Sequence, residues 1–219
     1  MKNYLYKELK LCISPVNYLF LAITSMILIP SYPCYVPFFY ICLSIFFIFN
    51  NAELNKDIAY SMILPITKKD IVKSRCIIIA VYEIIAVIIT IPFSLIMTQV
   101  WKIENLAGID ANIAFYGLNF ITMTIFNFFM LTKYYKKAEK PGIAFLIGSI
   151  IYWIVYAILE FPIWCKNILN IDYIKLIDST AWSDQIKQLP VLAFGIVVFI
   201  LGWILTYKVS AKRFEKVDL

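Results

Sequence analysis

The sequence predicts an all-α integral membrane protein that crosses the bilayer with six transmembrane helices and keeps both ends in the cytoplasm. Composition is the first reason: 62% of the 219 residues are hydrophobic and only 16% are charged, whereas about 25% are charged in soluble domains. The second reason is that the apolar residues gather in runs of roughly 15 to 25, which match a hydrocarbon core about 30 Å thick. The third is a strong asymmetry in the positions of lysine and arginine.

Six apolar stretches are predicted to be the spans. They cover Val16–Pro30, Val36–Asn50, Cys76–Val100, Ala111–Thr132, Gly142–Leu159 and Leu189–Tyr207. The first two form a tight hairpin, because residues 16–49 are too long for one helix and Pro30, Pro33 and Pro37 interrupt them. Pro141 suits the first turn of the fifth span. Helices are expected throughout, since a lone strand cannot satisfy its backbone hydrogen bonds in lipid.

Loop charge predicts the orientation. With the N-terminus inside, the inner segments hold every lysine and arginine except Lys102, Lys166, Lys175 and Lys187. Such a bias follows the positive-inside rule. It also accounts for the net charge of +6 without nucleic acid as a partner, because the basic residues set topology and meet anionic lipid of the inner leaflet. The chain is therefore expected to form one transmembrane domain over residues 1–219.

Three segments outside the spans carry most of the remaining information. Residues 1–14 place apolar side chains at helical spacing between lysines, which is typical of an amphipathic helix in the inner interface; an ordinary basic flank to the first span fits equally well. Residues 51–75 form a cytoplasmic loop longer than two neighbouring helices need. Residues 161–188 form an outer loop, in which short interfacial helices or a packed, immobile cap are both compatible with the sequence.

The 51–75 loop is predicted to contain a short amphipathic helix. Its apolar edge and the residues around that edge are Lys56, Asp57, Ile58, Tyr60, Met62 and Leu64. Pro65 ends this helix, and Thr67 stands three residues before Asp70 in a capping-box arrangement that starts a second helix leading into the third span. Such a surface is typical of a binding site for a partner, and a solvated loop with chance amphipathicity is the alternative.

Residues for catalysis are mostly missing. The chain has no histidine, which argues against His-based triads, the usual zinc sites and the commonest general base. It also lacks the phosphate-loop motif for ATP hydrolysis, so no enzyme activity, metal or cofactor is expected in this chain. Glu83 is an acidic residue well inside a span, where a charge costs about 2.5 kcal/mol or more. A functional role facing a cavity is possible, and so is contact with Lys73, Arg75 or water.

The architecture and two local motifs resemble the permease subunits of type-2 ABC exporters in their half-transporter form. The stretch from Met62 to Arg75 resembles the family's "sLPisrkeiVksK" segment, and Tyr6 to Lys10 resembles its "l-x-K-E-l" opening. The architectural match covers the whole chain, while the sequence match is confined to these stretches. Arg75 stands where the family often has lysine.

The resemblance implies a separate role for each of the three segments outside the spans. Residues 1–14 would be the connecting helix, residues 55–64 the coupling helix that docks on a separate ATP-binding subunit, and the outer loop a helical gate. ATP and magnesium would be bound by the partner, and a second permease chain, identical or paralogous, would complete the pore. Contact with the ATPase subunit is expected from Glu53, Lys56, Asp57, Ile58, Tyr60, Met62, Leu64, Pro65, Lys68 and Lys69.

The substrate class also comes only from the resemblance. Relatives of this form export amphipathic peptides, antimicrobial compounds or lipids across the bacterial plasma membrane, which is therefore the expected location. The sequence leaves one alternative open, a scaffold or immunity protein that sequesters a toxic peptide and needs neither an ATPase nor a coupling loop. An intramembrane enzyme is disfavoured by the missing histidine and nucleophile motifs.

Overall fold

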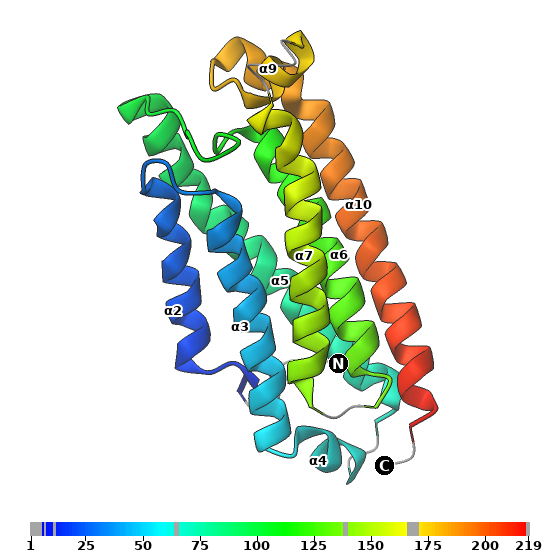
Figure 1. The fold of residues 1–219 in the computed structure, drawn as a ribbon. Helices are drawn as coiled ribbons and strands as arrows, with labels where there is room; N and C mark the ends of the chain where they lie inside the picture. The colour runs from blue at the N-terminus through cyan, green and yellow to red at the C-terminus, as the bar shows by residue number, and fades with distance from the viewer. Residues whose placement is uncertain are drawn as a thin grey trace.

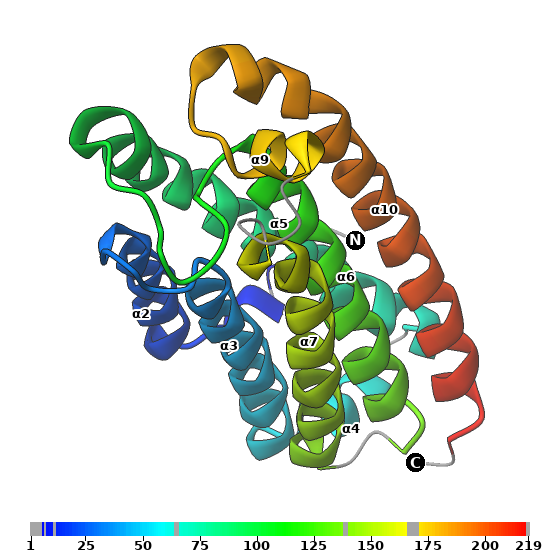
Figure 2. The ribbon, with the colours of Figure 1, turned by 45° about the horizontal axis from the view of Figure 1, so that its top comes forward.

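The computed structural model describes residues 6, 8–10, 12–63, 66–137, 140–165 and 171–217, and these ranges contain helices and no strand. The elements are α2 (Pro15–Ile23), the 3₁₀-helix η1 (Thr24–Leu28), α3 (Tyr35–Leu54), α4 (Asp57–Ile63), α5 (Lys68–Leu95), the π-helix η2 (Ile96–Trp101), α6 (Ile113–Tyr134), α7 (Pro141–Trp164), α9 (Asp172–Asp178) and α10 (Trp182–Glu215). The long helices run side by side in one bundle, with α4 across one end and α9 at the other (Figures 1 and 2). The all-α prediction is confirmed.

Five helical segments are long and apolar enough to cross a membrane. They are Tyr35–Leu54, Lys68–Trp101, Ile113–Tyr134, Pro141–Trp164 and Trp182–Glu215. The first predicted span is shorter, because its 9 α-helical and 5 3₁₀ residues extend over only about 24 Å at the usual rises of about 1.5 and 2.0 Å per residue. A hydrocarbon core is about 30 Å thick, so it remains a prediction that this first predicted span crosses the membrane.

Local hydrogen bonds explain why the first predicted span tightens into a 3₁₀-helix. The hydroxyls of Thr24 and Ser25 donate to the carbonyls of Leu21 and Ala22 at 2.6 and 2.8 Å. These hydrogen bonds from side-chain hydroxyls to backbone carbonyls compete with the regular backbone hydrogen bonds of an α-helix. The chain then turns and re-enters the bundle as α3, as the prolines near residue 30 predicted.

A polar contact fixes the short helix α2 against the bundle. The Asn17 amide donates to the Ser44 hydroxyl at 2.8 Å and to the Ser44 carbonyl at 2.9 Å, and the Tyr82 hydroxyl donates to the Asn17 carbonyl at 2.7 Å. All three hydrogen bonds are buried. They link α2 to α3 and α5, and therefore hold this short segment alongside α3 and antiparallel to it, where Figure 1 shows it.

The helix α5 begins earlier than the predicted span because of its cap. The Thr67 hydroxyl accepts a hydrogen bond from the Asp70 backbone N–H at 3.2 Å, and the Asp70 carboxylate accepts one from the Thr67 N–H at 3.2 Å. This is the predicted capping box, and it is confirmed. A continuous helix thus leads from Lys68 into the membrane core.

The last helix also extends beyond the predicted span, from Trp182 rather than Leu189. Its polar first turns contain Gln185 and Gln188, which are buried, not solvated. The Gln188 amide donates to the Ser179 carbonyl at 2.8 Å and accepts from the Ala114 N–H at 3.1 Å. Polarity alone suggested a loop here, but these side chains satisfy backbone groups of the outer segment and keep the chain helical.

The helices α6 and α10 approach each other at two glycines. A Cβ added at Gly195 would lie 2.7 Å from the Gly117 Cα, whereas a Cβ added at Gly142 would meet no atom within 4 Å. Small residues allow membrane helices to pack closely. Replacing Gly195 with leucine is therefore expected to cost about 1–3 kcal/mol in the free energy of unfolding, measured by thermal unfolding in detergent. Gly142→Ala is the control, with a change within about 1 kcal/mol; equal effects of the two substitutions would contradict this packing.

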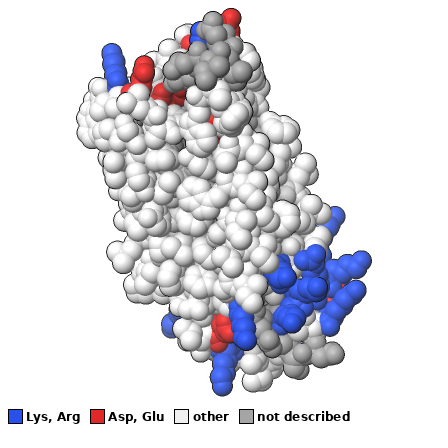
Figure 3. Space-filling view, viewed as in Figure 1, with Lys and Arg blue, Asp and Glu red and all other residues white. Residues whose placement is uncertain are grey.

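Charged side chains avoid the middle of the face of the bundle that Figure 3 shows. In Figure 3, lysine and arginine side chains gather at the end that carries α4 and the C-terminal end of α10, and the face between the two ends is almost free of charge. An uncharged band is what a hydrocarbon core requires. The basic end corresponds to the side that loop charge predicts to be cytoplasmic.

Candidate functional site

The short helix α4 lies across the basic end of the bundle (Figure 1). The α3 helix ends at Leu54, and Lys56 then adopts a left-handed conformation with φ of 49°. Left-handed residues commonly terminate helices and reverse the chain direction. The Lys56 N–H donates to the Glu53 carbonyl at 3.0 Å. This tight turn sends α4 sideways instead of continuing α3 out of the membrane.

The outer face of α4 carries apolar side chains that are exposed. Ile63 is 84% exposed and Tyr60 is 52% exposed, and Met62 is exposed beside them. A hollow of about 450 Å³ adjoins this face, lined in part by Glu53 and Ile58. Exposed apolar side chains next to a hollow are typical of a protein-binding surface. We call Tyr60, Met62 and Ile63 the α4 outer face; Glu53 at the end of α3 and Lys56 in the turn are exposed beside it.

The inner face of α4 is tied to the bundle through one arginine. Asp57 is fully buried and accepts a hydrogen bond from Arg75 Nη2 of α5 at 2.7 Å. Arg75 Nε donates to the carboxylate of Glu8, in the helical segment that precedes α2. The guanidinium also lies 5.3 Å from the centre of the Phe49 ring of α3. We call Glu8, Asp57 and Arg75 the Arg75 network.

The Arg75 network satisfies the conditions under which a buried charge is tolerated. Its three side chains are at most 3% exposed, and isolated ions would be very costly there. Both carboxylates receive charge-assisted hydrogen bonds from the same guanidinium. One buried ion network therefore joins the N-terminal helical segment, α4 and the start of α5.

The same cluster contains potential metal ligands. Donor atoms of Glu8, Cys12 and Asp57 lie within 4.8 Å of one another. However, Arg75 already supplies positive charge to both carboxylates. Burial raises the pKa of the Cys12 thiol to about 12, so the thiolate that a metal would require is disfavoured. The geometry is that of an ion network and not of a metal centre.

The structure distributes the predicted contact residues over two places. Glu53, Lys56, Tyr60 and Met62 are exposed together on or beside α4, Ile58 is half-buried, and Asp57 is buried in the Arg75 network. Leu64 and Pro65 lie outside the described residues. The role of the whole set in binding a partner stays a prediction.

Two predicted residues lie instead against the C-terminal end of the chain. Lys68 Nζ donates to the Val217 carbonyl at 2.6 Å and lies 6.0 Å from the centre of the Phe214 ring. Lys69 forms an exposed ion pair with Glu215 at 3.1 Å. Both lysines therefore belong to the contact of α5 with the end of α10.

The residues predicted from the sequence to form this site did not include Ile63, Glu8 or Arg75. Ile63 could have been found as an apolar residue one helical turn after Tyr60. The pairing of Glu8 with Arg75 spans 67 residues and has no local signal. A lone arginine among the lysines of this loop was the one available hint, because arginine suits buried, multiply bonded ion pairs better than lysine does.

Glu83 occupies the core of the bundle and meets neither Lys73 nor Arg75. Its Oε1 accepts a hydrogen bond from the Asn127 amide of α6 at 2.8 Å, and the residue is fully buried. Within the described residues, Glu83 Oε2, Asn127 Oδ1 and Trp203 Nε1 have no hydrogen-bond partner. These atoms form a small polar centre between α5, α6 and α10. A functional role for Glu83 stays a prediction.

Two substitutions of Glu83 are expected to behave differently. Leucine would leave the buried Asn127 amide without its acceptor, and should lower the free energy of unfolding by about 1–3 kcal/mol. Glutamine would keep the acceptor for the Asn127 amide, so most of the stability should be retained. Thermal unfolding in detergent measures both. Equal destabilisation by the two variants would show that stability depends on the carboxyl group itself and that an amide cannot replace it.

At the opposite end, the segment around α9 is packed onto the bundle. The Asn112 amide donates to the Ile177 carbonyl at 2.7 Å, and the Gln99 amide donates to the Thr180 carbonyl at 2.8 Å. Glu160 accepts from the Ile109 N–H at 3.0 Å. Side chains from η2, α6 and α7 thus hold the backbone of the outer segments. This arrangement favours a packed cap.

Comparison with known families gives one result that extends over nearly the whole molecule. A family model described as "ABC-2 family transporter protein" matches residues 3–213. The match includes α4, the Arg75 network and all five long helices. No curated protein and no solved structure matches the chain.

Proposed function

Because the chain belongs to the ABC-2 family of transporter proteins, we propose that it is the permease of an exporter driven by a separate ATP-binding subunit. The chain is a multi-pass membrane protein of an ABC transporter family. The observation that carries the proposal is the α4 outer face, an open apolar surface at the basic end that is anchored inward by Arg75. ATP and magnesium belong to the partner in this proposal, and this chain supplies no catalytic residue.

The Arg75 network gives the proposed partner a mechanical path into the membrane. A partner that docks on the α4 outer face contacts residues on the same helix as Asp57. Asp57 is bonded to Arg75, which lies in the helix α5 that crosses the bundle. Displacement of α4 when the partner binds ATP would therefore move α5 and the N-terminal helical segment together. This coupling would alternately open and close the transport path.

The proposed topology has six crossings with both ends in the cytoplasm. The α2–η1 segment would be the first of these crossings in chain order. Local thinning of the bilayer would accommodate its shorter length. Placement of the basic end in the cytoplasm follows from the positive-inside rule. The bacterial plasma membrane is the proposed location, because the permeases that this sequence resembles act there.

The proposed substrates are amphipathic peptides, antimicrobial compounds or lipid-like molecules moved outward. A cleft of about 380 Å³ between α5, η2, α6 and α10 supports this class, since ligand sites usually begin at about 300 Å³. Its walls are mainly aliphatic and aromatic, while the hydroxyls of Ser94 and Tyr116, bonded to each other at 2.8 Å, supply polarity. Such a lining suits a molecule with an apolar body and few polar groups. A second permease chain would complete the path.

Co-purification tests the proposed function. The tagged chain would be co-expressed with candidate ATP-binding subunits, extracted in detergent and purified through its tag. The proposal predicts that an ATPase is retained and that its ATP hydrolysis changes when this chain is bound. Absence of any ATPase from the purified chain would favour the scaffold or immunity protein instead.

A further inference from the structure

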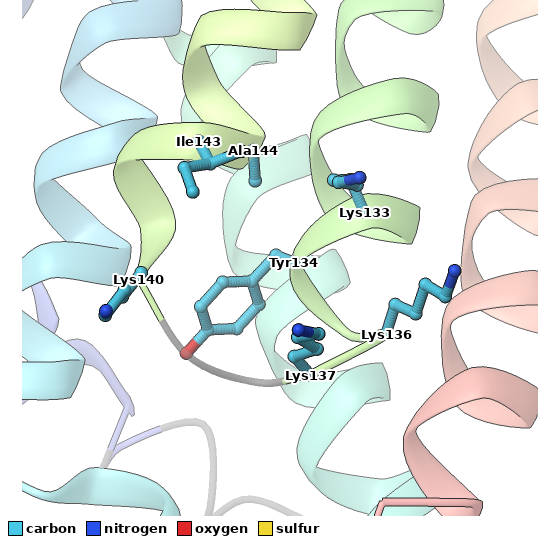
Figure 4. A pocket seen from close by; sticks show the side chains of 7 residues that line it. All are labelled: Lys133, Tyr134, Lys136, Lys137, Lys140, Ile143 and Ala144. Carbon is cyan, nitrogen blue, oxygen red and sulfur yellow. The ribbon is translucent and has the colours of Figure 1, made fainter.

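Lysines near the end of α6 and at the start of α7 line a basic hollow of about 320 Å³ (Figure 4). Its walls carry Lys133, Lys136, Lys137 and Lys140, together with Tyr134 and Ile143. Among the described residues, none of these four lysines takes part in an ion pair. The positive-inside rule accounts for lysines at this end, but it does not require them to surround a hollow.

Other hydrogen-bond donors also line this hollow. The Tyr134 side chain is almost fully buried, and its hydroxyl has no hydrogen-bond partner among the described residues. The first turn of α7 carries no side-chain cap, and its first residue, Pro141, has no N–H, so the N–H groups of Gly142 and Ile143 are the ones available for an anion. Open space surrounds Gly142 in this turn. The donors, the positive charge and the free volume together suit a phosphate group.

An apolar stripe leads away from the hollow along α7. Its members are exposed and recur every three or four residues, so they share one face of the helix. They are Ile143, Leu146, Ile150, Ile154, Ile158 and Phe161. Ile143 belongs to both features, because it lines the hollow and begins the stripe. A ligand with a charged head and long apolar chains would contact both at once.

We propose that the hollow binds the phosphate of an anionic phospholipid and that the acyl chains of this lipid lie along the exposed stripe of α7. The lysines neutralise the phosphate, and Tyr134 and the first N–H groups of α7 donate hydrogen bonds to it. A small soluble anion would use only the hollow, and an acidic surface of a partner protein would leave the stripe unused. The continuity of hollow and stripe therefore favours a lipid of the inner leaflet. This site does not depend on the proposed transport function.

The test measures lipid affinity of the purified full-length chain in an uncharged detergent by native mass spectrometry. The probes are dioctanoyl phosphatidylglycerol, dioctanoyl phosphatidylcholine and inorganic phosphate. The pocket variant is Lys136→Gln/Lys137→Gln/Lys140→Gln. The matched control is Lys208→Gln/Lys212→Gln/Lys216→Gln, which removes the same charge from exposed positions near the end of α10.

Phosphatidylglycerol is expected to bind more tightly than phosphatidylcholine and to resist competition by inorganic phosphate. The pocket variant should lose about fivefold in phosphatidylglycerol affinity for each lysine removed, and the control should retain most of its affinity. Equal losses in both variants would overturn the site in favour of diffuse attraction. Competition by phosphate would make it a small-anion site. Efficient crosslinking between copies that carry Ile150→Cys would show that a second chain, and not lipid, covers the stripe.

Discussion

Replacing Arg75 with methionine is expected to lower the free energy of unfolding by about 3–5 kcal/mol. The substitution would leave the buried carboxylates of Glu8 and Asp57 without the guanidinium that bonds to both. Methionine fills a similar volume, so the expected loss comes from the uncompensated charge and not from a cavity. The measurement is thermal unfolding of the purified protein in detergent, together with its yield from the membrane.

A rescue variant and a surface control make this result specific. Adding Glu8→Gln and Asp57→Asn to the methionine variant removes both carboxylate charges, and should restore most of the lost stability. Lys69→Met breaks the exposed pair with Glu215 and should change stability by no more than about 1 kcal/mol. If the triple variant is no more stable than Arg75→Met alone, charge compensation is not what Arg75 contributes.

Replacing Ile63 with glutamate is expected to abolish binding of the ATP-binding subunit without unfolding the chain. Ile63 is the most exposed apolar residue of the α4 outer face, and a charge there would have to be buried when a partner docks. Removing one central apolar anchor of an interface commonly costs 2 kcal/mol or more, which corresponds to about a thirtyfold loss of affinity. The measurement is the amount of ATPase retained during co-purification.

Leu106 provides the matched control for Ile63. Both side chains are 84% exposed, but Leu106 lies in the segment between η2 and α6, at the opposite end of the bundle. Leu106→Glu should therefore leave ATPase binding unchanged and have the same small effect on stability. Equal loss of ATPase from both variants would point to a general defect in membrane insertion. Retention of the ATPase by Ile63→Glu would remove α4 from the interface.

Features set by neighbouring residues were predictable from the sequence. Thr67 and Asp70 are three residues apart, and their cap depends on backbone groups in the same turn, so the start of α5 could be inferred. Pro30 and Pro33 separated the first two helices for a similar reason. Pro37 was wrongly predicted to interrupt the chain: it lies in the first turn of α3, where proline suits a helix. The spans of α3, α6 and α7 followed from uninterrupted apolar runs, because hydrophobicity and length are all that a span requires.

Features that depend on tertiary contacts were not predictable. Asp57 belongs to a short amphipathic helix, and amphipathicity alone did not show that this carboxylate faces inward toward Arg75. Gln185 and Gln188 are polar, which suggested a loop, yet they are buried as backbone partners of the outer segment. Glu83 meets Asn127, which lies 44 residues away, because α5 and α6 pack together in the core. In each case the partner is remote in sequence and leaves no local pattern.

Crosslinking from position 63 tests the central claim, which is that the α4 outer face binds an ATP-binding subunit. A photoreactive amino acid would replace Ile63 in one sample and Leu106 in another, in membranes that contain the candidate ATPase. A crosslink between this chain and the ATPase is expected from position 63, and none from position 106. A crosslink from position 106, or the absence of one from position 63 when the ATPase co-purifies, would contradict it.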